Sequence, residues 1–159
     1  MVSVRRMIEC TYEPSSFRDP SGFLFYENNE LYRQINNSYK ENYEFLISSG
    51  LYENLVKNEL LISHEEIQME NKTDDGFIII KPERVPFVSY PYEWSFSQLK
   101  DAALITIKIQ KIAKKYNMML KDASAYNVQF KNSKPIFVDT LSFEKYIGGE
   151  PWKGYKQFI

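Results

Sequence analysis

The sequence predicts an α+β fold in which a small antiparallel sheet precedes a long helix and a second hairpin. Two β-prone runs, 22–26 and 31–35, flank a turn at Glu27-Asn28-Asn29-Glu30, where the asparagines tolerate a left-handed backbone. Apolar residues recur at helical spacing after position 95. The 159 residues are 43% hydrophobic, which is enough for one domain to bury a core without disulfides or metals. We therefore expect one domain over 21–159, after an irregular lead-in at 1–20.

Local signals place the elements of the amino-terminal half. Ser38 followed by Glu41 has the form of a capping box, so a helix is expected to begin there, with Gly50 at its C′ position. A second short helix is expected over 51–58. Asp74-Asp75-Gly76 predicts a turn between two strands. The runs 77–80 and 86–90 are rich in β-branched and aromatic residues, and both are expected to be short strands.

The carboxy-terminal half begins with a stronger helix signal. Ser95 and Gln98 form a second capping box, and the helix they open is expected to end near Lys114-Lys115, whose charges complement the helix dipole. The runs 128–130 and 136–138 predict a second hairpin around a polar turn at 131–134. Residues 151–159 stay aromatic and apolar to the end, which predicts that the chain is part of a longer protein.

Composition excludes several classes of protein. The 20 basic and 21 acidic residues nearly cancel, so no global field favours nucleic acid or anionic lipid. A single cysteine, Cys10, excludes an internal disulfide and suits a reducing compartment, so the cytoplasm is the expected location. No stretch approaches the ~20 apolar residues that span a bilayer. His64 is the only histidine, and we expect it in an exposed loop rather than in a metal cluster.

One segment contains the candidate catalytic and metal-binding residues. Leu120-Lys121-Asp122-Ala123-Ser124-Ala125-Tyr126-Asn127 follows the long helix, and Asp139 directly follows the hairpin. This order resembles the catalytic loop and metal-binding aspartate of protein kinases, in which an Asp, an Asn five residues later and a second Asp line one cleft. The resemblance implies a truncated protein-kinase-like fold, with a small lobe at about 21–90, a hinge, and the start of a larger lobe at about 91–159. It also implies ATP and Mg²⁺ as cofactors, Asp122 as the catalytic base, and Asn127 and Asp139 as metal ligands.

The kinase pattern is incomplete in this chain. The 27–30 turn has no glycines to approach a phosphate, and Arg33 stands where a kinase strand carries lysine. Arg33 is expected to pair with Glu41 or Glu44 on the following helix. Leu120-Lys121 replaces His-Arg, and Asp139-Thr140-Leu141 replaces Asp-Phe-Gly. The predicted nucleotide-binding residues are Arg33, Glu44 and Lys121. The alternative is that Asp122 and Asn127 only cap local turns and that Asp139 only ends a strand.

A longer resemblance covers roughly residues 20–158. It is carried by three stretches: 81–94 (Lys-Pro-Glu-Arg-Val-Pro-Phe-Val-Ser-Tyr-Pro-Tyr-Glu-Trp), 120–127 and 138–144 (Val-Asp-Thr-Leu-Ser-Phe-Glu). These look like the amino-terminal region of bacterial nodulation-protein-like, SAM-dependent methyltransferases. The resemblance implies that the methyltransferase module, with its S-adenosylmethionine, lies further along such proteins. No glycine-rich strand-to-helix turn that would bind that cofactor follows any predicted strand here.

Two functions follow as hypotheses. The first is a kinase-like domain that binds a nucleotide or another phosphate ligand, active or inactive, as the amino-terminal module of a larger methyltransferase-like protein. The second is a non-catalytic interaction domain that docks a partner, the methyltransferase module or a second copy through an apolar surface at 146–159.

Overall fold

The computed structural model describes residues 10–13, 16, 19–70, 72–149 and 151–157. The described chain is mixed α and β, with a small antiparallel sheet and three α-helices, as the sequence predicts. It divides into two compact units, 1–40 with 64–82 and 41–63 with 83–159. The sequence instead predicts lobes that divide near residue 90. The difference lies in segments 41–63 and 83–90, which belong to the second unit and are expected in the small lobe.

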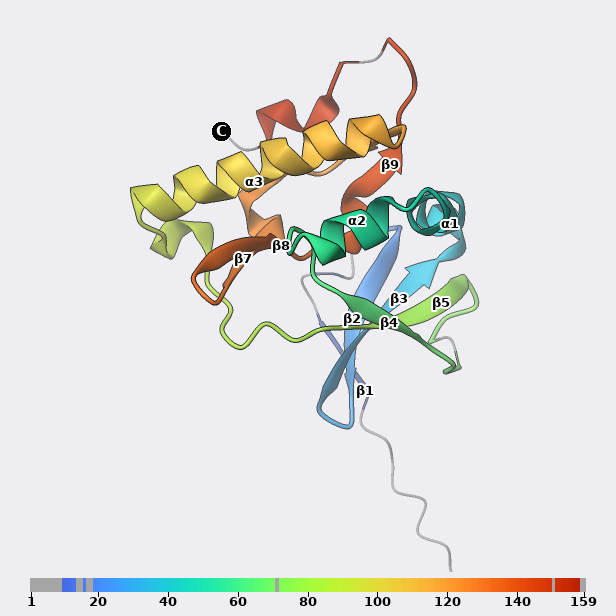
Figure 1. Ribbon diagram of the computed structural model, residues 1–159. Coiled ribbons are helices and arrows are strands. Elements are labelled where there is room, and N and C mark those ends of the chain that lie inside the picture. The colour runs from blue at the N-terminus through green and yellow to red at the C-terminus, as the bar shows by residue number, and fades with distance from the viewer. Residues whose placement is uncertain (1–9, 14–15, 17–18, 71, 150, 158–159) are drawn as a thin grey trace, which may run out of the picture. The chain divides into compact units, whose positions relative to one another are not determined.

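The first unit is built on a five-stranded antiparallel sheet with the order β1-β2-β3-β5-β4 (Figure 1). Its strands are β1 Cys10–Tyr12, β2 Gly22–Glu27, β3 Glu30–Asn36, β4 His64–Ile67 and β5 Gly76–Pro82. The predicted β2–β3 hairpin is confirmed, and Asn28 and Asn29 take positive φ angles of 52° and 64° in its turn. Strand β1 lies within the segment for which the sequence predicts an irregular lead-in.

The core of this unit lies against one face of the sheet. Phe23, Phe25 and Ile79 are buried together, with Tyr32 and Met69 packed against them. Phe23 and Phe25 point to the same face because they are two residues apart in one strand. The predicted turn before β5 is confirmed at residues 74–75.

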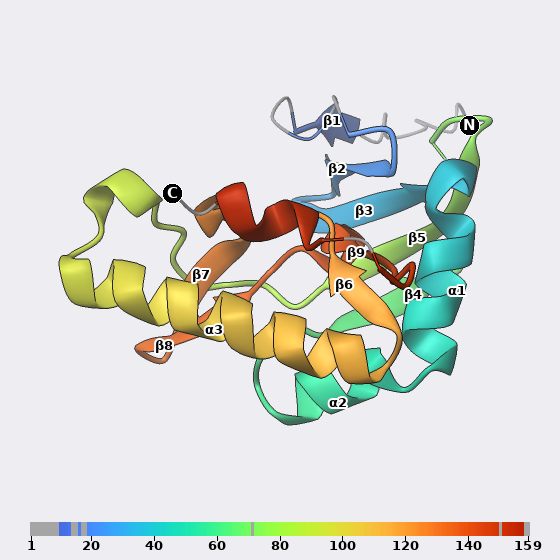
Figure 2. The same cartoon turned by 90° about the horizontal axis from the view of Figure 1, so that it is seen from above.

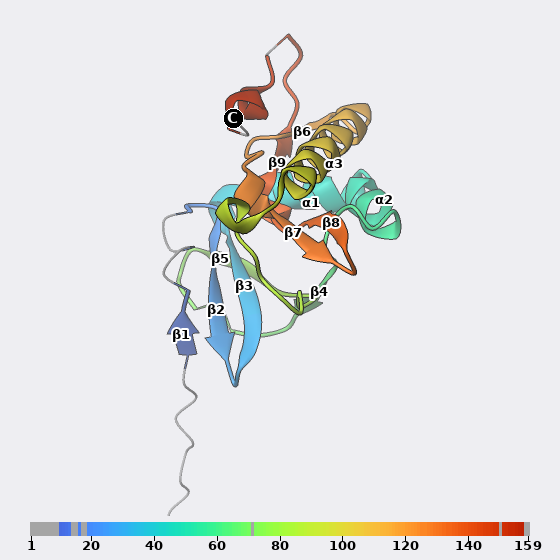
Figure 3. The same ribbon diagram turned by 90° about the vertical axis from the view of Figure 1, so that its left-hand side faces the viewer.

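The second unit holds the helices and two short pairs of antiparallel strands (Figure 2). Its elements are α1 Lys40–Ser48, α2 Leu51–Lys57, α3 Phe96–Lys115, β6 Met118–Leu120, β7 Val128–Lys131, β8 Lys134–Phe137 and β9 Phe143–Lys145; the first residue of α1 belongs to the other unit. β6 pairs with β9, and β7 pairs with β8 (Figure 3). The β7–β8 hairpin, α2 and α3 are confirmed predictions, whereas β6 and β9 have no clear signal in the sequence.

Helix α3 forms the centre of this unit because one of its faces is apolar. Its buried residues recur at intervals of three and four, at Ala102, Ile105, Thr106, Ile109 and Ala113. The predicted capping box at its start is confirmed: the Gln98 backbone N–H donates to the Ser95 hydroxyl, and the Ser95 N–H donates to the Gln98 side chain. The helix packs against β6 and β8, so it supports the loop between β6 and β7.

Two local predictions are wrong. Ser38 does not cap α1: it lies inside a 3-10 turn, Asn37–Tyr39, and its hydroxyl donates to the carbonyl of Pro20 at 2.7 Å. The run 86–90 is not a strand. The backbone N–H and carbonyl of Ser89 both bond to the side chain of Gln129, at 2.9 and 3.0 Å, so a side-chain amide occupies groups that a neighbouring strand would need.

Candidate functional site

The loop that carries the predicted catalytic residues runs from β6 to β7 and is held by its own polar side chains. Asp122 Oδ1 accepts a hydrogen bond from the Ser124 backbone N–H at 3.0 Å. The Ser124 hydroxyl accepts from the Tyr126 N–H at 3.3 Å. The Asn127 N–H donates to the Ser124 carbonyl at 3.0 Å. The loop is therefore a pair of consecutive side-chain-capped turns, which agrees with the local capping role considered for Asp122.

The structure brings two of the three predicted chemical residues into one hydrogen-bonded cluster. Asn127 Nδ2 donates to Ser142 Oγ at 3.2 Å, and Ser142 Oγ donates to Asp139 Oδ2. Asp139 Oδ1 accepts from the Leu141 N–H at 3.1 Å. The Val138 N–H also bonds to the Asn127 carbonyl at 2.8 Å. Side chains twelve positions apart in the sequence thus meet at Ser142, which lies in the 138–144 stretch but has no role predicted from the sequence.

Asp122 is placed on the same loop as Asn127, five residues earlier. Its Oδ1 faces the Ser124 N–H within its own turn, whereas Asn127 and Asp139 turn toward Ser142. The loop also meets the cluster through its backbone, because the Lys121 N–H donates to the Ser142 carbonyl at 2.8 Å. The segment that begins with Asp139 therefore holds both ends of the loop.

The predicted nucleotide-binding residues are spread over both units. Arg33 lies on β3 with its side chain mostly buried, and its Nη2 forms an ion pair with Asp19 Oδ2 at 3.3 Å. Glu44 lies exposed on α1 in the second unit, so its pairing with Arg33 stays a prediction. Glu41 lies 3.7 Å from the Lys145 ammonium, with its side chain 89% exposed. Lys121 is half-buried at the start of the loop.

The donor set at Asn127 and Asp139 suits a hard cation, since Mg²⁺ prefers carboxylate and amide oxygens. It is a sparse set. Among the described residues, no three histidine, cysteine, aspartate or glutamate side chains form a group that could hold a metal ion. A metal at this position would need oxygen ligands from water or from a bound phosphate, as Mg²⁺ sites commonly do.

The carboxy-terminal segment packs onto the same loop, on both sides of Asp122. Trp152 Nε1 donates to the Leu120 carbonyl at 2.9 Å. Gln157 Oε1 accepts from the Ala123 N–H at 2.7 Å, and its Nε2 donates to the Lys121 carbonyl at 3.5 Å. The 3-10 turn Lys153–Lys156 lies between these two anchors. The apolar character of this segment is visible in the sequence, but its contacts with the loop are not.

Several exposed aromatic side chains lie in segment 87–96 and at Tyr126 of the loop, and we name them together the exposed aromatic surface. It is formed by Phe87, Tyr90, Tyr92, Phe96 and Tyr126, with Phe87, Tyr92 and Phe96 at least 75% exposed. Tyr90 and Tyr92 stack in parallel, with ring centroids 5.5 Å apart. Desolvation, followed by the charges of Glu93, Tyr90 and Tyr126, raises the pKa of Tyr92 above its ordinary value. Within the same segment Trp94 is buried, with its ring edge-on to Phe130 and the ring centroids 5.2 Å apart.

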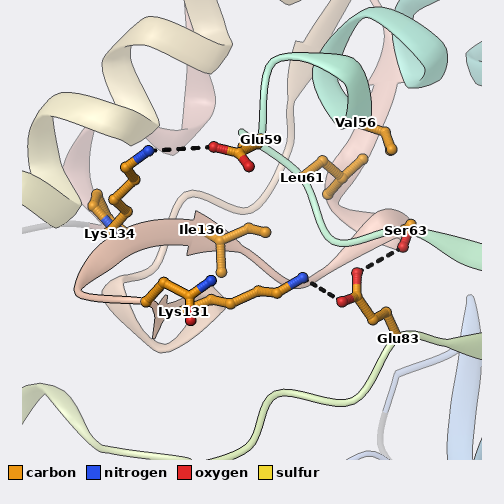
Figure 4. Close-up of a pocket in the computed structure, with 10 residues that line it drawn as sticks. Val56, Glu59, Leu61, Ser63, Glu83, Lys131, Lys134 and Ile136 are labelled. Atoms are coloured by element: carbon orange, nitrogen blue, oxygen red, sulfur yellow. Dashed lines mark hydrogen bonds and ion pairs between the residues drawn. The ribbon is translucent and has the colours of Figure 1, made fainter.

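A separate cavity of about 160 Å³ lies between α2 and the β7–β8 hairpin (Figure 4). Val56, Leu61 and Ile136 give it apolar walls. At one edge Glu83 forms an ion pair with Lys131 and accepts a hydrogen bond from Ser63 at 2.9 Å. These two contacts lower the pKa of the Glu83 carboxyl. Because its charged groups already pair with one another, the cavity offers a ligand little uncompensated charge.

His64 differs from its prediction. It lies in strand β4 rather than in an exposed loop, opposite Pro82 of β5, and is half-buried. Burial lowers the pKa of its imidazole from 6.5 to about 4. Within the described residues, no helix is both long and apolar enough to cross a membrane.

Comparison with known proteins gives one informative relative. No protein-family model matches the sequence. Over 146 residues the chain is 35% identical to nodulation protein NoeA of Rhizobium meliloti (strain 1021), a match that covers 90% of this chain and 30% of that protein. The chain is thus homologous to part of NoeA and spans about 30% of the length of that relative.

Proposed function

We propose that this chain is a kinase-like module that binds a nucleotide or another phosphate ligand with Mg²⁺, and that it forms the amino-terminal part of a larger protein resembling SAM-dependent methyltransferases. The homology to 30% of NoeA supports its place within a longer protein. The convergence of Asn127 and Asp139 on Ser142 is the observation that carries the proposed site. S-adenosylmethionine belongs to the remainder of such a protein.

The arrangement of strands around the loop supports the kinase-like part of the proposal. β6 and β9 pair at the two ends of the segment, and the β7–β8 hairpin lies between them in sequence. This order delivers Asp122 before the hairpin and Asp139 after it. The β2–β3 turn, by contrast, has Asn28 and Asn29 where a phosphate-binding loop would have glycines, so we propose ligand binding without phosphoryl transfer.

In this proposal each residue has one role. Asn127 and Asp139 hold the cation through oxygen atoms, and the cation spreads the charge of the phosphates. Asp122 lies at the position of a base toward an acceptor hydroxyl. Lys121 supplies a positive charge at the start of the loop.

A thermal shift experiment tests the proposal. We expect ATP with Mg²⁺, but not ATP alone, to raise the melting temperature, because a ligand that binds only the folded state stabilises it by about 2.7 kcal/mol at 100 times its Kd. Asp139→Asn should abolish the Mg²⁺-dependent part. Asp74→Asn, which neutralises an exposed turn carboxylate in the other unit, should retain it. No shift of the unmodified chain at millimolar nucleotide would refute the proposed binding.

The exposed aromatic surface favours a second candidate function, that of a non-catalytic interaction domain. Tyrosine and phenylalanine are enriched at protein interfaces, and large exposed apolar patches mark docking sites. Ile147 and Tyr155 add exposed apolar area in the 146–159 segment, where docking is predicted from the sequence. Self-association should then appear in sedimentation equilibrium and weaken in Tyr92→Ser/Phe96→Ser. A monomer at every concentration would exclude docking between copies.

A further inference from the structure

We infer that Ser142 is the positioning residue of the proposed metal site, which it assembles by holding Asn127 and Asp139 through one buried hydroxyl. The inference rests on the proposed function and adds a residue to it. Ser142 has no exposed surface and lies at the end of the 3-10 turn Thr140–Ser142. Both of the proposed metal ligands reach this single atom, Ser142 Oγ.

The direction of each hydrogen bond follows from the number of protons available. A serine hydroxyl carries one proton, and an ionised carboxylate can only accept. The Ser142 proton therefore goes to Asp139 Oδ2, and the same hydroxyl must accept from Asn127. This requirement fixes the orientation of the Asn127 amide: Nδ2 faces Ser142, and Oδ1 faces away from it. Only Oδ1 is able to bind a cation, so the Ser142 hydroxyl directs the metal-binding atom of Asn127 away from itself.

The same contacts limit how Asp139 can move. Its Oδ2 accepts from Ser142 and its Oδ1 accepts from the Leu141 N–H at 3.1 Å. A carboxylate oxygen has two lone pairs, so accepting one hydrogen bond does not by itself prevent it from binding a cation. Rotation of the carboxylate would break both bonds at once. Asp139 is thus held in one orientation before any cation arrives.

The backbone of Ser142 ties the rest of the loop to this point. Its carbonyl accepts from the Lys121 N–H at 2.8 Å, one residue before Asp122. One residue therefore contacts the start of the loop by its backbone and the two proposed ligands by its side chain. A change to alanine keeps the backbone contact and removes only the hydroxyl, which makes the side-chain role separable.

The first experiment measures cation binding by Mn²⁺ titration with ATP, followed by electron paramagnetic resonance. Groups that orient metal ligands typically account for about 10–100-fold in affinity. We expect Ser142→Ala to weaken Mn²⁺ binding by at least about 10-fold. The matched control is Thr106→Val, which removes another buried hydroxyl, one that donates to the Ala102 carbonyl at 2.8 Å. This control should leave the Mn²⁺ affinity unchanged, and equal affinities in wild type and Ser142→Ala would overturn the inference.

The second experiment needs no ligand, so it separates this inference from the proposed function. Unfolding by urea is measured for Asn127→Ala, Asp139→Ala and the double variant, once in the wild-type background and once in the Ser142→Ala background. The two side chains should be coupled when the Ser142 hydroxyl is present and uncoupled when it is absent. One possible result is that wild type binds no Mn²⁺ and that the coupling is lost in Ser142→Ala. Ser142 would then still position the side chains of Asn127 and Asp139, and the proposed metal site would be refuted. Coupling that survives Ser142→Ala refutes the positioning role.

Discussion

Glutamine side chains hold much of the irregular backbone of this protein. Each of four glutamines bonds to backbone groups of a distant segment: Gln34 to Lys72 and Thr73, Gln110 to Leu120, Gln129 to Ser89, and Gln157 to Lys121 and Ala123. A primary amide has both a donor and an acceptor, so it can satisfy a backbone N–H and a carbonyl that no strand reaches. Three of these four contacts support the proposed site or the aromatic surface next to it.

His64 predicts a pH dependence of stability at the residue scale. Its pKa is about 4 in the folded chain and about 6.5 when unfolded, so the unfolded chain takes up the proton first as the pH falls. The free energy of unfolding should therefore decrease between pH 6.5 and pH 4, by up to about 3 kcal/mol. Urea unfolding at several pH values measures this decrease.

The control for this prediction is His64→Gln. It removes the only histidine of the chain, so the difference between the two pH profiles isolates the imidazole from the carboxylates that titrate over the same range. Parallel profiles for wild type and variant between pH 6.5 and 4 would show that His64 is not protonated preferentially in the unfolded chain.

At the scale of elements, the two capping boxes show how a local signal succeeds or fails. Ser95 and Gln98 bond to each other's backbone as the pattern predicts, because both residues lie at the start of one helix. Ser38 has the same spacing to Glu41, yet its hydroxyl donates to the Pro20 carbonyl, eighteen residues away. The Ser38 capping box does not form because the Ser38 hydroxyl bonds to a residue distant in sequence, and a pattern of neighbouring residues cannot predict that bond.

The 151–157 segment gives a prediction at this scale through Gly154. A methyl group at this position would lie 2.9 Å from the Ala123 side chain and 2.8 Å from Trp152 Nε1. Gly154→Ala should destabilise the protein by about 1–3 kcal/mol, the usual range for overpacking. It should also loosen the loop around Asp122, because Trp152 and Gln157 hold that loop.

Gly148→Ala is the matched control, since no atom lies within 4 Å of the added methyl. Its free energy of unfolding in urea should stay within about 0.5 kcal/mol of wild type or rise slightly. Amide hydrogen exchange of Ala123 measures the loop directly. Equal urea midpoints for the two alanine variants would mean that the segment does not pack on the loop as described.

At the scale of the whole molecule, the chain passes from the first unit to the second, back again, and then to the second once more. The first unit is discontinuous in sequence, because segment 41–63 of the second unit separates its two parts. Phe137 lies within the core of the second unit, fully buried, with its ring edge-on to Phe143 at 6.1 Å. Its backbone also bonds to Leu60 and Ile62, which precede the return to the first unit.

Phe137→Ala should therefore cost about 3–5 kcal/mol, as large-to-small changes in a core do. Segment 41–63 of the second unit joins the two parts of the first unit along the chain, so unfolding of the second unit would turn this connection into a flexible loop with an entropic cost of closure. We therefore expect one unfolding transition rather than two. Far-UV circular dichroism reports on all strands, and fluorescence reports on Trp94 and Trp152 of the second unit. Phe87→Ala, at a ring 75% exposed, should change the free energy of unfolding by less than about 0.5 kcal/mol. Separate midpoints for the two signals would contradict the single transition.

The sequence by itself determined the elements whose signals are local. The asparagine turn of β2–β3, the Ser95 cap of α3 and the β7–β8 hairpin all depend on residues within a few positions of one another. The order Asp122, Asn127, Asp139 also follows from the sequence. Tertiary structure alone decided what depends on distant partners: the strands β6 and β9, the irregular course of 86–90, and the meeting of Asn127 and Asp139 at Ser142. A serine hydroxyl has no preferred partner in sequence, and only the packed chain shows which acceptor takes its single proton.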